Sequence, residues 1–387
     1  MKKKIVIFGS TGSIGKSLLN IISKDKAKFK ISLLSANKNY NEIIKQAKLF
    51  DVKNIIITDK IAFKKAKNKL NKNNIKIFNN FDQLDKIFKN KVDYVMSSIV
   101  GIEGLYPTFK IIKHTKKIAI ANKESIICAW NLISKELNKH NTKFVPVDSE
   151  HFSIWYALDA QPNNIINKIY LTASGGSLLN ISKKKIIKLS LKRILKHPNW
   201  SMGNKITIDS STLMNKVFEV IETKKIFNLD YRNINVIIHE DSYVHAIVKF
   251  KNGMIKLVAH ETTMEIPIAN SLYNNNYRVN NKKDIDLKKL NNLKFKEVNI
   301  KKFPLINMLK LLPIKDSLFE TVLVSVNDEL VNLFLRKKIN YIDINSKLIE
   351  YMNKKEFKKY KKILPRTISE VINLSRKIQL KVRMNEL

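Results

Sequence analysis

Short apolar runs alternate with stretches of helical spacing over the first 147 residues. The apolar runs predict buried strands, and the stretches between them repeat apolar residues every three or four positions, as an amphipathic helix does. This rhythm is typical of a doubly wound parallel sheet, in which a helix follows each strand. The strands predicted in this way are Ile5–Phe8, Lys30–Leu34, Asn54–Ile57, Tyr94–Ser97, Lys117–Ala121 and Phe144–Val147.

The pattern changes after Val147. Predicted strands then mix with polar loops, at Lys168–Thr172, Lys205–Ile208, Asn235–His239 and Ala246–Phe250. Residues 274–291 are rich in Asn and Lys and read as a linker, and amphipathic helices are predicted at Asp316–Leu335 and Ile368–Val382. We therefore expect an α/β protein with three parts: an N-terminal Rossmann-like doubly wound parallel sheet (1–147), a central α/β domain (148–285), and a linker with a C-terminal helical domain (286–387).

Three of the nine glycines of this 387-residue chain lie in the run KIVIFGSTGSIG, as Gly9, Gly12 and Gly15. They separate the first predicted strand from a predicted helix at Ile14–Ile22. A glycine-lined turn at a helix N-terminus lets backbone N–H groups approach a pyrophosphate, and the helix dipole favours its charge. The run therefore predicts a dinucleotide site, with a tight turn that binds no ligand as the alternative.

The end of the second predicted strand indicates which dinucleotide is bound. An NAD site usually carries an acidic residue about 20 residues beyond the glycines, where it holds the ribose 2′-hydroxyl. Here the strand ends instead in Ser35, Ala36, Asn37, Lys38 and Asn39. A lysine and two amides suit a 2′-phosphate, so NADP is favoured over NAD.

Charge and composition limit the other classes of function. The net charge is +39, from 72 basic and 33 acidic residues, which suits either a polyanion binder or a lysine-rich composition spread over solvated faces. The lysines are scattered and arginine is scarce, which favours the second interpretation, so we expect no nucleic-acid partner. No apolar run reaches the roughly 18–20 residues that span a bilayer, the glycine turn interrupts any signal peptide, and a lone cysteine fits a reducing cytoplasm.

Two acidic residues flank Ser149 in the run VPVDSEH, directly after a predicted strand. In an extended chain, Asp148 and Glu150 would point the same way. Two carboxylates on one side would repel each other unless a cation lay between them, and oxygen ligands suit Mg²⁺ or Mn²⁺. Taken alone, the pattern equally suits a capping arrangement at a helix N-terminus.

The run HPNWSMGNKITIDSSTLMNKVFE, residues 197–219, carries further candidate chemistry. The part from His197 to Gly203 predicts a lid loop, and Ile206 and Ile208 predict a strand. We expect Asp209 or Ser210 to cap a following helix that carries Asn215, Lys216 and Glu219. Ser210 and Lys216 would together bind an anion, and Glu219 would supply a third carboxylate to the metal. Ser174, in the run TASGG, would contact the phosphate from a second side. Each serine alone could instead be a simple helix cap.

Six motifs occur together and in order: GSTGSIG, ANKES, VDSEH, SGG, HPNWSMG and DSSTLMNKVFE. The chain thereby resembles the 1-deoxy-D-xylulose 5-phosphate reductoisomerase family over nearly its whole length. The resemblance implies NADPH- and metal-dependent rearrangement and reduction of 1-deoxy-D-xylulose 5-phosphate to 2-C-methyl-D-erythritol 4-phosphate in non-mevalonate isoprenoid synthesis. It also implies Mn²⁺ or Mg²⁺ as the metal, with Co²⁺ as a further candidate, a phosphorylated sugar as substrate and a homodimer.

The resemblance also assigns roles to individual residues. The NADPH contacts fall on Thr11, Gly12, Ser13, Ile14, Asn37, Lys38, Asn39, Asn122, Glu124 and Gly203. The metal ligands fall on Asp148, Glu150 and Glu219. The substrate contacts fall on Lys123, Ser149, Glu150, Ser174, His197, Ser210, Asn215, Lys216 and Glu219, and further pocket positions on His151, Ser242 and His245.

Within this set, Lys123, Glu150 and His197 are the candidate catalytic residues. Lys123 and Glu150 would handle protons, while His197 and Trp200 would close over the substrate and exclude water. Because Ser149 lies between two metal ligands, we expect the backbone to turn there. The chain departs from the family pattern at Asn37, at His260–Met264 and at Asp328.

Two rival functions make different demands on the chain. A thiol-dependent semialdehyde or acyl-phosphate reductase would need a nucleophilic cysteine, but Cys128 lies in the apolar run IICAW and is expected to be buried and structural. A nucleic-acid-binding protein that kept a dinucleotide fold would bind tightly and with strong salt dependence, and the scattered charges argue against it.

Overall fold

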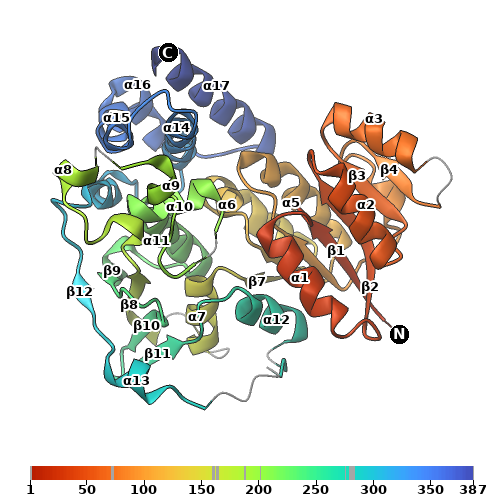
Figure 1. The fold of residues 1–387 in the computed structure, drawn as a ribbon, viewed down its shortest axis with the longest axis horizontal. Helices are drawn as coiled ribbons and strands as arrows, with labels where there is room; N and C mark the ends of the chain where they lie inside the picture. Colours follow the sequence, from red (N-terminus) through yellow and green to blue (C-terminus); the bar gives the residue numbers. More distant parts are fainter. Residues whose placement is uncertain are drawn as a thin grey trace. The chain divides into compact units, whose positions relative to one another are not determined.

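A computed structural model gives the fold (Figure 1) and describes residues 2–70, 74–158, 162, 165–186, 189–200, 202–274, 276–278 and 284–386. The chain forms two compact units. Unit 1 contains Met1–Ser125, Leu132–Asp148 and Met264–Arg278, and unit 2 contains Ile126–Asn131, Ser149–Thr263 and Val279–Leu387.

Unit 1 is built on a seven-stranded parallel sheet with the order β4-β3-β2-β1-β5-β6-β7. The expected doubly wound fold is confirmed. The sequence pattern missed β4, which has only three residues, none of them fully buried. The elements are β1 (Lys3–Phe8), α1 (Ser13–Ser23), β2 (Phe29–Ala36), α2 (Tyr40–Leu49), β3 (Asn54–Ile57), α3 (Lys60–Lys69), β4 (Lys76–Phe78), α4 (Leu84–Ile87), β5 (Tyr94–Ser97), η1 (Ile102–Gly104), α5 (Leu105–Ile111), η2 (Ile112–His114), β6 (Lys117–Ile120), α6 (Lys123–Lys139), β7 (Lys143–Pro146) and α12 (Glu265–Tyr273). Within α6, residues Ile126–Asn131 group with unit 2.

The core of unit 1 explains its continuous apolar runs. Ile5 to Phe8 of β1 are fully buried, as expected for a parallel sheet covered on both faces. Helices α1, α2 and α3 pack on this core, and α12, distant in sequence, adds Ile268 and Leu272 to it. Residues 264–278 thus group with unit 1, although they lie in the segment predicted as a central domain; the division into three parts stays a prediction.

Unit 2 combines a five-stranded sheet, in the order β11-β10-β8-β9-β12, with helices. Strands β8 and β9 pair in parallel, and the other pairs are antiparallel. The elements are α7 (Ser149–Leu158), β8 (Ile166–Ala173), η4 (Gly176–Leu178), α8 (Lys183–Ile186), α9 (Leu191–Ile194), α10 (Asn204–Ser211), α11 (Met214–Phe227), η5 (Tyr231–Asn233), β9 (Ile234–Ile238), β10 (Val244–Phe250), β11 (Ile255–Ala259), α13 (Leu287–Asn291), β12 (Lys296–Glu297), η6 (Pro304–Leu311), α14 (Leu318–Leu335), α15 (Tyr341–Asn353), α16 (Lys355–Lys358), η7 (Lys359–Lys362) and α17 (Ile368–Glu386).

The predicted helical C-terminal region is confirmed. Helix α14 packs against α15 and α17, shown in blue in Figure 1. It begins with a capping box in which Ser317 and Glu320 satisfy each other's backbone N–H groups, and most of its residues are buried. The predicted linker at 274–291 contains the short helix α13, and part of that segment lies outside the described residues.

The strand predicted at Lys205–Ile208 is wrong, because these residues lie in helix α10. The alternation of Ile206 and Ile208 does not indicate a strand here. Residues on several sides of α10 are buried, so apolar residues are not confined to the spacing of one helix face. Lys205 pairs with Asp209 one turn later at 3.2 Å, a contact that the helical spacing makes possible. Asp209 and Ser210 therefore lie inside α10 and do not cap the next helix, which begins after Leu213.

No helix among the described residues is both long enough and apolar enough to cross a membrane.

Candidate active site

The glycine turn of unit 1 joins β1 to α1. Gly9 adopts a φ of 76°, and a Cβ added at Gly15 would lie 2.5 Å from the Gly9 carbonyl oxygen and from Ser10 Cα, so helix and turn pack closely. Gly12 is the N-cap residue of α1, and no side chain caps this helix. Thr11, Gly12, Ser13 and Ile14 thus lie where backbone N–H groups are available to an anion.

The three polar residues after β2 are exposed at the end of that strand. Asn37 donates a hydrogen bond to Thr58 Oγ1 at 2.8 Å, and Asn39 caps α2 by accepting from Glu42 N at 3.3 Å. Lys38 has no carboxylate within ion-pair distance among the described residues. An unpaired ammonium group beside two amides has the chemistry that a 2′-phosphate needs.

Asn122 ties the start of α6 to the loop after β5. Its side chain accepts from Ser125 N at 2.8 Å and donates to the carbonyl oxygens of Ile99 and Gly101 at 2.6 and 2.9 Å. It also donates to Glu124 Oε2 at 2.9 Å. Both predicted cofactor residues, Asn122 and Glu124, are thus buried and bonded to each other, so they hold the loop in place.

Lys123 follows directly and forms an ion pair with Asp148, with Nζ and Oδ2 2.5 Å apart. Asp148 is the last residue of unit 1 and is bonded to Ser149, the first residue of α7, so the chain itself keeps its carboxylate beside that helix. Both side chains are mostly shielded from solvent. A strong ion pair in such a place fixes the two charged groups in position.

The residues that follow Asp148 turn into helix α7. Glu150 therefore lies in the first helical turn, and strand alternation does not describe how it approaches Asp148. The expected turn of the backbone at Ser149 is present, and Ser149 Oγ donates to Glu150 Oε2 at 2.6 Å. The helix-start interpretation of this acidic pair describes the backbone correctly, and the carboxylates are nevertheless close enough to share a ligand.

Helix α11 brings the third predicted carboxylate to the same place. One carboxylate oxygen each from Asp148, Glu150 and Glu219 can be chosen so that all three atoms lie within 4.8 Å of one another. Lys216 Nζ lies 2.6 Å from Glu150 Oε1 and 2.5 Å from Glu219 Oε2. Asn215 donates to the other oxygen of Glu219. The three predicted metal ligands are therefore assembled from two helices and the residue before the first.

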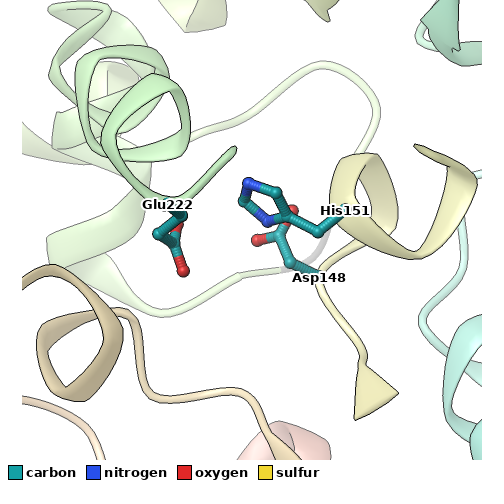
Figure 2. A group of neighbouring side chains, drawn as sticks. All are labelled: Asp148, His151 and Glu222. Carbon is teal, nitrogen blue, oxygen red and sulfur yellow. The ribbon is translucent and has the colours of Figure 1, made fainter. Parts of the chain in front are cut away.

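A second set of possible ligands shares Asp148. Figure 2 shows Asp148, His151 and Glu222 with their side chains turned toward one another, and their ligand atoms also lie within 4.8 Å of one another. His151 Nε2 contacts the Glu219 carbonyl oxygen and Thr223 Oγ1, each at 3.1 Å. Sequence reasoning missed Glu222, although its position one turn beyond Glu219 places it on the same side of α11.

The chemistry of the first set fits a divalent metal. Carboxylate oxygens are the ligands that Mg²⁺ and Mn²⁺ prefer, and three carboxylates at this separation need positive charge between them. The second set offers a nitrogen atom, which Mg²⁺ disfavours. The all-oxygen set of Asp148, Glu150 and Glu219 is therefore the better match to the predicted metal.

The charges of this cluster determine the pKa of Lys216. Burial alone would lower the pKa of this amine, but the carboxylates of Glu150 and Glu219 outweigh burial and raise it. Lys216 is thus a buried cation at neutral pH. The expected cradle of Ser210 and Lys216 takes a different form, because the ammonium group pairs here with the two carboxylates.

Two predicted phosphate ligands meet at His197. Its Nε2 lies 3.1 Å from Ser174 Oγ and 3.2 Å from Ser210 Oγ. Ser174 Oγ in turn accepts from Gly176 N at 3.1 Å. Gly176 packs so closely on α10 that a Cβ there would lie 2.6 Å from Ser211 Cα, which holds the two serine-bearing segments together.

The hydrogen bonds of His197 define its protonation. Nδ1 accepts from the backbone N–H groups of Asn199 and Trp200, at 3.2 and 3.0 Å, so the proton of the neutral ring lies on Nε2, facing the serines. Desolvation, followed by the charge of Lys216, lowers the pKa of His197 to about 4. His197 is therefore a neutral hydrogen-bond donor at physiological pH.

The loop after His197 is anchored at several points. Asn199 Nδ2 donates to the Glu240 carbonyl oxygen at 2.5 Å and to Ser242 Oγ at 3.1 Å. Trp200 meets the ring of His245 edge-on, with centroids 5.9 Å apart, and His245 stacks on His260 at 3.8 Å. The departure at His260 thus supplies a ring that supports this aromatic group. Gly203, the last residue of the predicted loop, is the exposed N-cap of α10.

Cys128 lies within α6 and is buried, as expected.

Comparison with known proteins covers the whole chain. Three family profiles match: "1-deoxy-D-xylulose 5-phosphate reductoisomerase" over residues 5–130, its C-terminal domain over 144–227, and "DXP reductoisomerase C-terminal domain" over 260–380. The chain is 57% identical over 382 residues to 1-deoxy-D-xylulose 5-phosphate reductoisomerase of Pelagibacter ubique, covering 98% of each protein. It is 38% identical to that of Clostridium tetani, covering 92% of this chain and 94% of the relative.

Solved structures agree with these relatives. The reductoisomerase from Zymomonas mobilis in complex with NADPH matches with a TM-score of 0.87 and 26% identity, over 100% of this chain and 99% of that one. A DOX-P reductoisomerase in complex with NADPH, fosmidomycin and magnesium matches with a TM-score of 0.89 and 30% identity, over 99% of this chain and 97% of that one.

Proposed function

Because the chain belongs to the 1-deoxy-D-xylulose 5-phosphate reductoisomerase family, we propose the activity of that family as its function. The protein is an NADPH- and divalent-metal-dependent oxidoreductase that converts 1-deoxy-D-xylulose 5-phosphate to 2-C-methyl-D-erythritol 4-phosphate. The reaction is a skeletal rearrangement followed by reduction, and it supplies isoprenoid precursors.

The observation that carries this proposal is the cluster of three carboxylates, Asp148, Glu150 and Glu219, gathered within 4.8 Å. These residues would hold Mg²⁺ or Mn²⁺, with Co²⁺ as a further candidate. A bound divalent cation would polarise the substrate carbonyl and lower the pKa of a neighbouring hydroxyl. Asn215 and Ser149 orient the carboxylates through their hydrogen bonds to Glu219 and Glu150.

The phosphate group of the substrate would be bound around Ser174, Ser210 and His197. Two hydroxyl groups and one imidazole N–H provide donors to the phosphate oxygens without adding charge. The low pKa of His197, caused mainly by burial, keeps the ring neutral across the physiological pH range, so Nδ1 continues to accept from the loop and Nε2–H continues to face the serines. Asn215 and Lys216, which lie on the first turn of α11, complete the group of proposed phosphate contacts.

Lys123 and Glu150 are the proposed proton-handling residues. The ammonium group of Lys123 lies 2.5 Å from Asp148 Oδ2. This ion pair pre-organises the ammonium group to donate a hydrogen bond to a developing oxyanion. Glu150 contacts both Ser149 Oγ and Lys216. Trp200, held against His245, would shield the bound substrate from water.

We assign NADPH to the turn between β1 and α1 and to the end of β2. The uncapped N-terminus of α1 provides N–H groups for the pyrophosphate, and Lys38 provides a cation for the 2′-phosphate. Asn122 and Glu124 shape the neighbouring loop. Gly203 leaves space around the start of α10, since a Cβ there would meet no atom within 4 Å. NADPH itself supplies the hydride.

The protein would act as a homodimer in the cytoplasm, where NADPH is available. Strand β11 lies at the edge of its sheet and exposes apolar side chains, with Ile255 52% and Leu257 48% exposed and neighbouring Met254 62% exposed. An exposed apolar edge strand favours pairing with another chain, and a second copy would cover it.

The proposal is tested by following NADPH oxidation by the purified protein. We expect turnover of 1-deoxy-D-xylulose 5-phosphate with Mn²⁺ or Mg²⁺, and its loss when a chelator is added. The unphosphorylated sugar 1-deoxy-D-xylulose is the matched control, and it should react far more slowly because it lacks the group that Ser174 and Ser210 bind. Equal rates for the two sugars, or turnover that survives the chelator, would contradict the proposal.

A further inference from the structure

The ammonium group of Lys216 lies between two carboxylates that are both proposed to bind metal. Its Nζ is 2.6 Å from Glu150 Oε1 and 2.5 Å from Glu219 Oε2, and the residue is only 4% exposed. Contacts this short on both sides make Lys216 a bridge between α7 and α11. The lysine thus supplies the positive charge that the buried carboxylates require.

A divalent metal held by the same carboxylates would compete with this arrangement. Glu150 and Glu219 belong to the group of three oxygen donors within 4.8 Å, and an oxygen that coordinates a metal at about 2.1 Å leaves little room for an ammonium group on the same site. Two cations a few ångströms apart also repel each other strongly in a buried place. Metal binding therefore favours a state in which the ammonium group has left at least one carboxylate.

The phosphate pocket gives the released ammonium group a destination. The backbone N–H of Leu213 donates to the Ser210 carbonyl oxygen at 3.2 Å, and that of Lys216 donates to the Leu213 carbonyl oxygen at 3.1 Å, so the turn after Ser210 leads directly into the first turn of α11. His197 contacts Ser174 and Ser210 at 3.1 and 3.2 Å, and the charge of Lys216 contributes to the lowered pKa of that ring. Lys216 therefore lies on the segment that adjoins the proposed phosphate ligands, and rotation of its flexible side chain would bring the ammonium group toward them.

We propose that Lys216 acts as an internal cation that occupies the carboxylate pair before metal binds and then moves to the phosphate of the substrate. This inference rests on the proposed function, since it takes the metal and phosphate sites as given. Metal and phosphate are then coupled through one side chain: each ligand favours the state in which Lys216 has left Glu150 and Glu219. Linkage makes the coupling reciprocal, so either ligand raises the affinity for the other by the same factor.

The test measures Mn²⁺ binding by electron paramagnetic resonance in the absence of substrate and NADPH. Lys216→Gln removes the competing cation, so we expect its Mn²⁺ affinity to be about tenfold higher than that of the wild type. Lys216→Arg keeps the charge and should gain no affinity. Lys224→Gln is the matched control, because it removes a positive charge from the same helix away from the carboxylate pair.

Methyl phosphate serves as the probe for coupling. In the wild type it should tighten Mn²⁺ binding by about tenfold, by drawing the ammonium group away from the carboxylates. In Lys216→Gln it should have no such effect. Lys216→Met provides a second neutral variant, and circular dichroism confirms that each protein is folded before binding is measured.

The two levels of the proposal fail in different ways. Equal or weaker Mn²⁺ binding in folded Lys216→Gln and Lys216→Met, or coupling to methyl phosphate that persists in them, overturns the exchange of Lys216. Wild-type protein that binds no Mn²⁺, or binds it equally well after Glu219→Gln, overturns the metal site itself and with it the proposed function.

Discussion

The cofactor turn between β1 and α1 and the cluster of Asp148, Glu150, Glu219 and Lys216 are built on opposite principles. The turn works through its backbone: Gly9, Gly12 and Gly15 keep side chains away, and the N-terminus of α1 is left without a side-chain cap. The cluster works through side chains, with Glu150 from α7 and Glu219 from α11 held together by Lys216. The turn depends on the lack of side chains in one short segment. The cluster depends on charged side chains that come from segments distant in sequence.

This difference determines how each site tolerates change. A glycine turn is fixed by local geometry, so a substitution acts through steric contact and leaves the electrostatics intact. A buried cluster of three carboxylates and a lysine is stable only while its charges balance, and removal of one partner leaves another charge uncompensated. We therefore expect the largest functional losses from single changes in this cluster.

Glu219→Gln should have the largest effect. The substitution preserves shape but removes one of three charged metal ligands, and we expect kcat/KM to fall by about a thousandfold, or about 4 kcal/mol of transition-state stabilisation. The fold should persist, since the amide can still contact Asn215 and Lys216. Steady-state NADPH oxidation over a range of Mn²⁺ concentrations measures the loss.

The matched control for this variant is Glu222→Gln, one turn further along α11. Glu222 belongs to the alternative ligand set with His151 and Asp148 (Figure 2). If the all-oxygen set holds the metal, Glu222→Gln should change the Mn²⁺ requirement by less than about tenfold. The opposite ranking of the two variants would move the metal to the histidine-containing set.

Two glycines of the cofactor turn provide the corresponding test in unit 1. A Cβ at Gly15 would lie 2.5 Å from two backbone atoms, whereas a Cβ at Gly12 would meet only the Gly9 carbonyl oxygen at 3.4 Å. We expect Gly15→Ala to destabilise the protein by about 1–3 kcal/mol through overpacking. Gly12→Ala should fold normally and weaken NADPH binding by about tenfold, or 1.4 kcal/mol.

Thermal unfolding and NADPH titration by fluorescence separate these two effects. Suppose that Gly15→Ala unfolded at the same temperature as the wild type while Gly12→Ala unfolded at a lower temperature. The close packing of Gly15 on Gly9 and Ser10 would then not be what limits the turn.

The same contrast explains how far sequence reasoning could reach. Six of the seven strands of unit 1 were predictable because they are continuous apolar runs in a sheet covered on both faces. The seventh, β4, has no fully buried residue and gave no such pattern. Helix α10 was not predictable in this way: Ile206 and Ile208 alternate as in a strand, but Ile208 is buried by tertiary packing and Lys205 pairs with Asp209 along a helix. Local alternation cannot show which environment surrounds a short segment.

The sequence likewise predicted only part of the candidate site. The motifs indicated which residues meet, and Asp148, Glu150 and Glu219 do come together. The predicted backbone was wrong, because Glu150 was expected to share one side of an extended strand with Asp148, and it lies in the first turn of helix α7. Lys216 pairs with Glu219 three positions along α11, a spacing that the sequence shows, but its pairing with Glu150 joins residues 66 positions apart. The neutral tautomer of His197 depends on how the following loop folds back, so that the N–H groups of Asn199 and Trp200 reach Nδ1, and no spacing pattern encodes that fold.

The buried phosphate pocket should also make stability depend on pH. Desolvation and nearby Lys216 lower the pKa of His197 from 6.5 to about 4 in the folded protein. As pH falls, the unfolded chain therefore binds a proton at this residue before the folded chain does. The stability contributed by neutral His197 is present above about pH 6.5 and is lost between about pH 6.5 and pH 4.

His197→Asn removes this ionisation, so its unfolding midpoint should drop less between pH 7 and pH 5 than that of the wild type. Urea titrations at the two pH values measure the difference. An unchanged pH dependence would mean that His197 is as well hydrated when folded as when unfolded, and that the pocket is not dry.

Lys38→Met should give the smallest effect, because it acts at an exposed position in unit 1. The ammonium group of Lys38 is expected to contact the 2′-phosphate that distinguishes NADPH from NADH, and an exposed ion pair contributes at most about 1 kcal/mol. The preference for NADPH over NADH, measured as the ratio of kcat/KM values, should therefore fall by about fivefold. Lys45→Met, on the exposed face of α2, removes the same charge from the same unit and should leave the ratio unchanged. If both variants lowered the ratio equally, the general positive field of the protein would govern cofactor choice, and the side chains at the end of β2 would not; unit 1 would then recognise the pyrophosphate by its backbone and the 2′-phosphate by no particular residue.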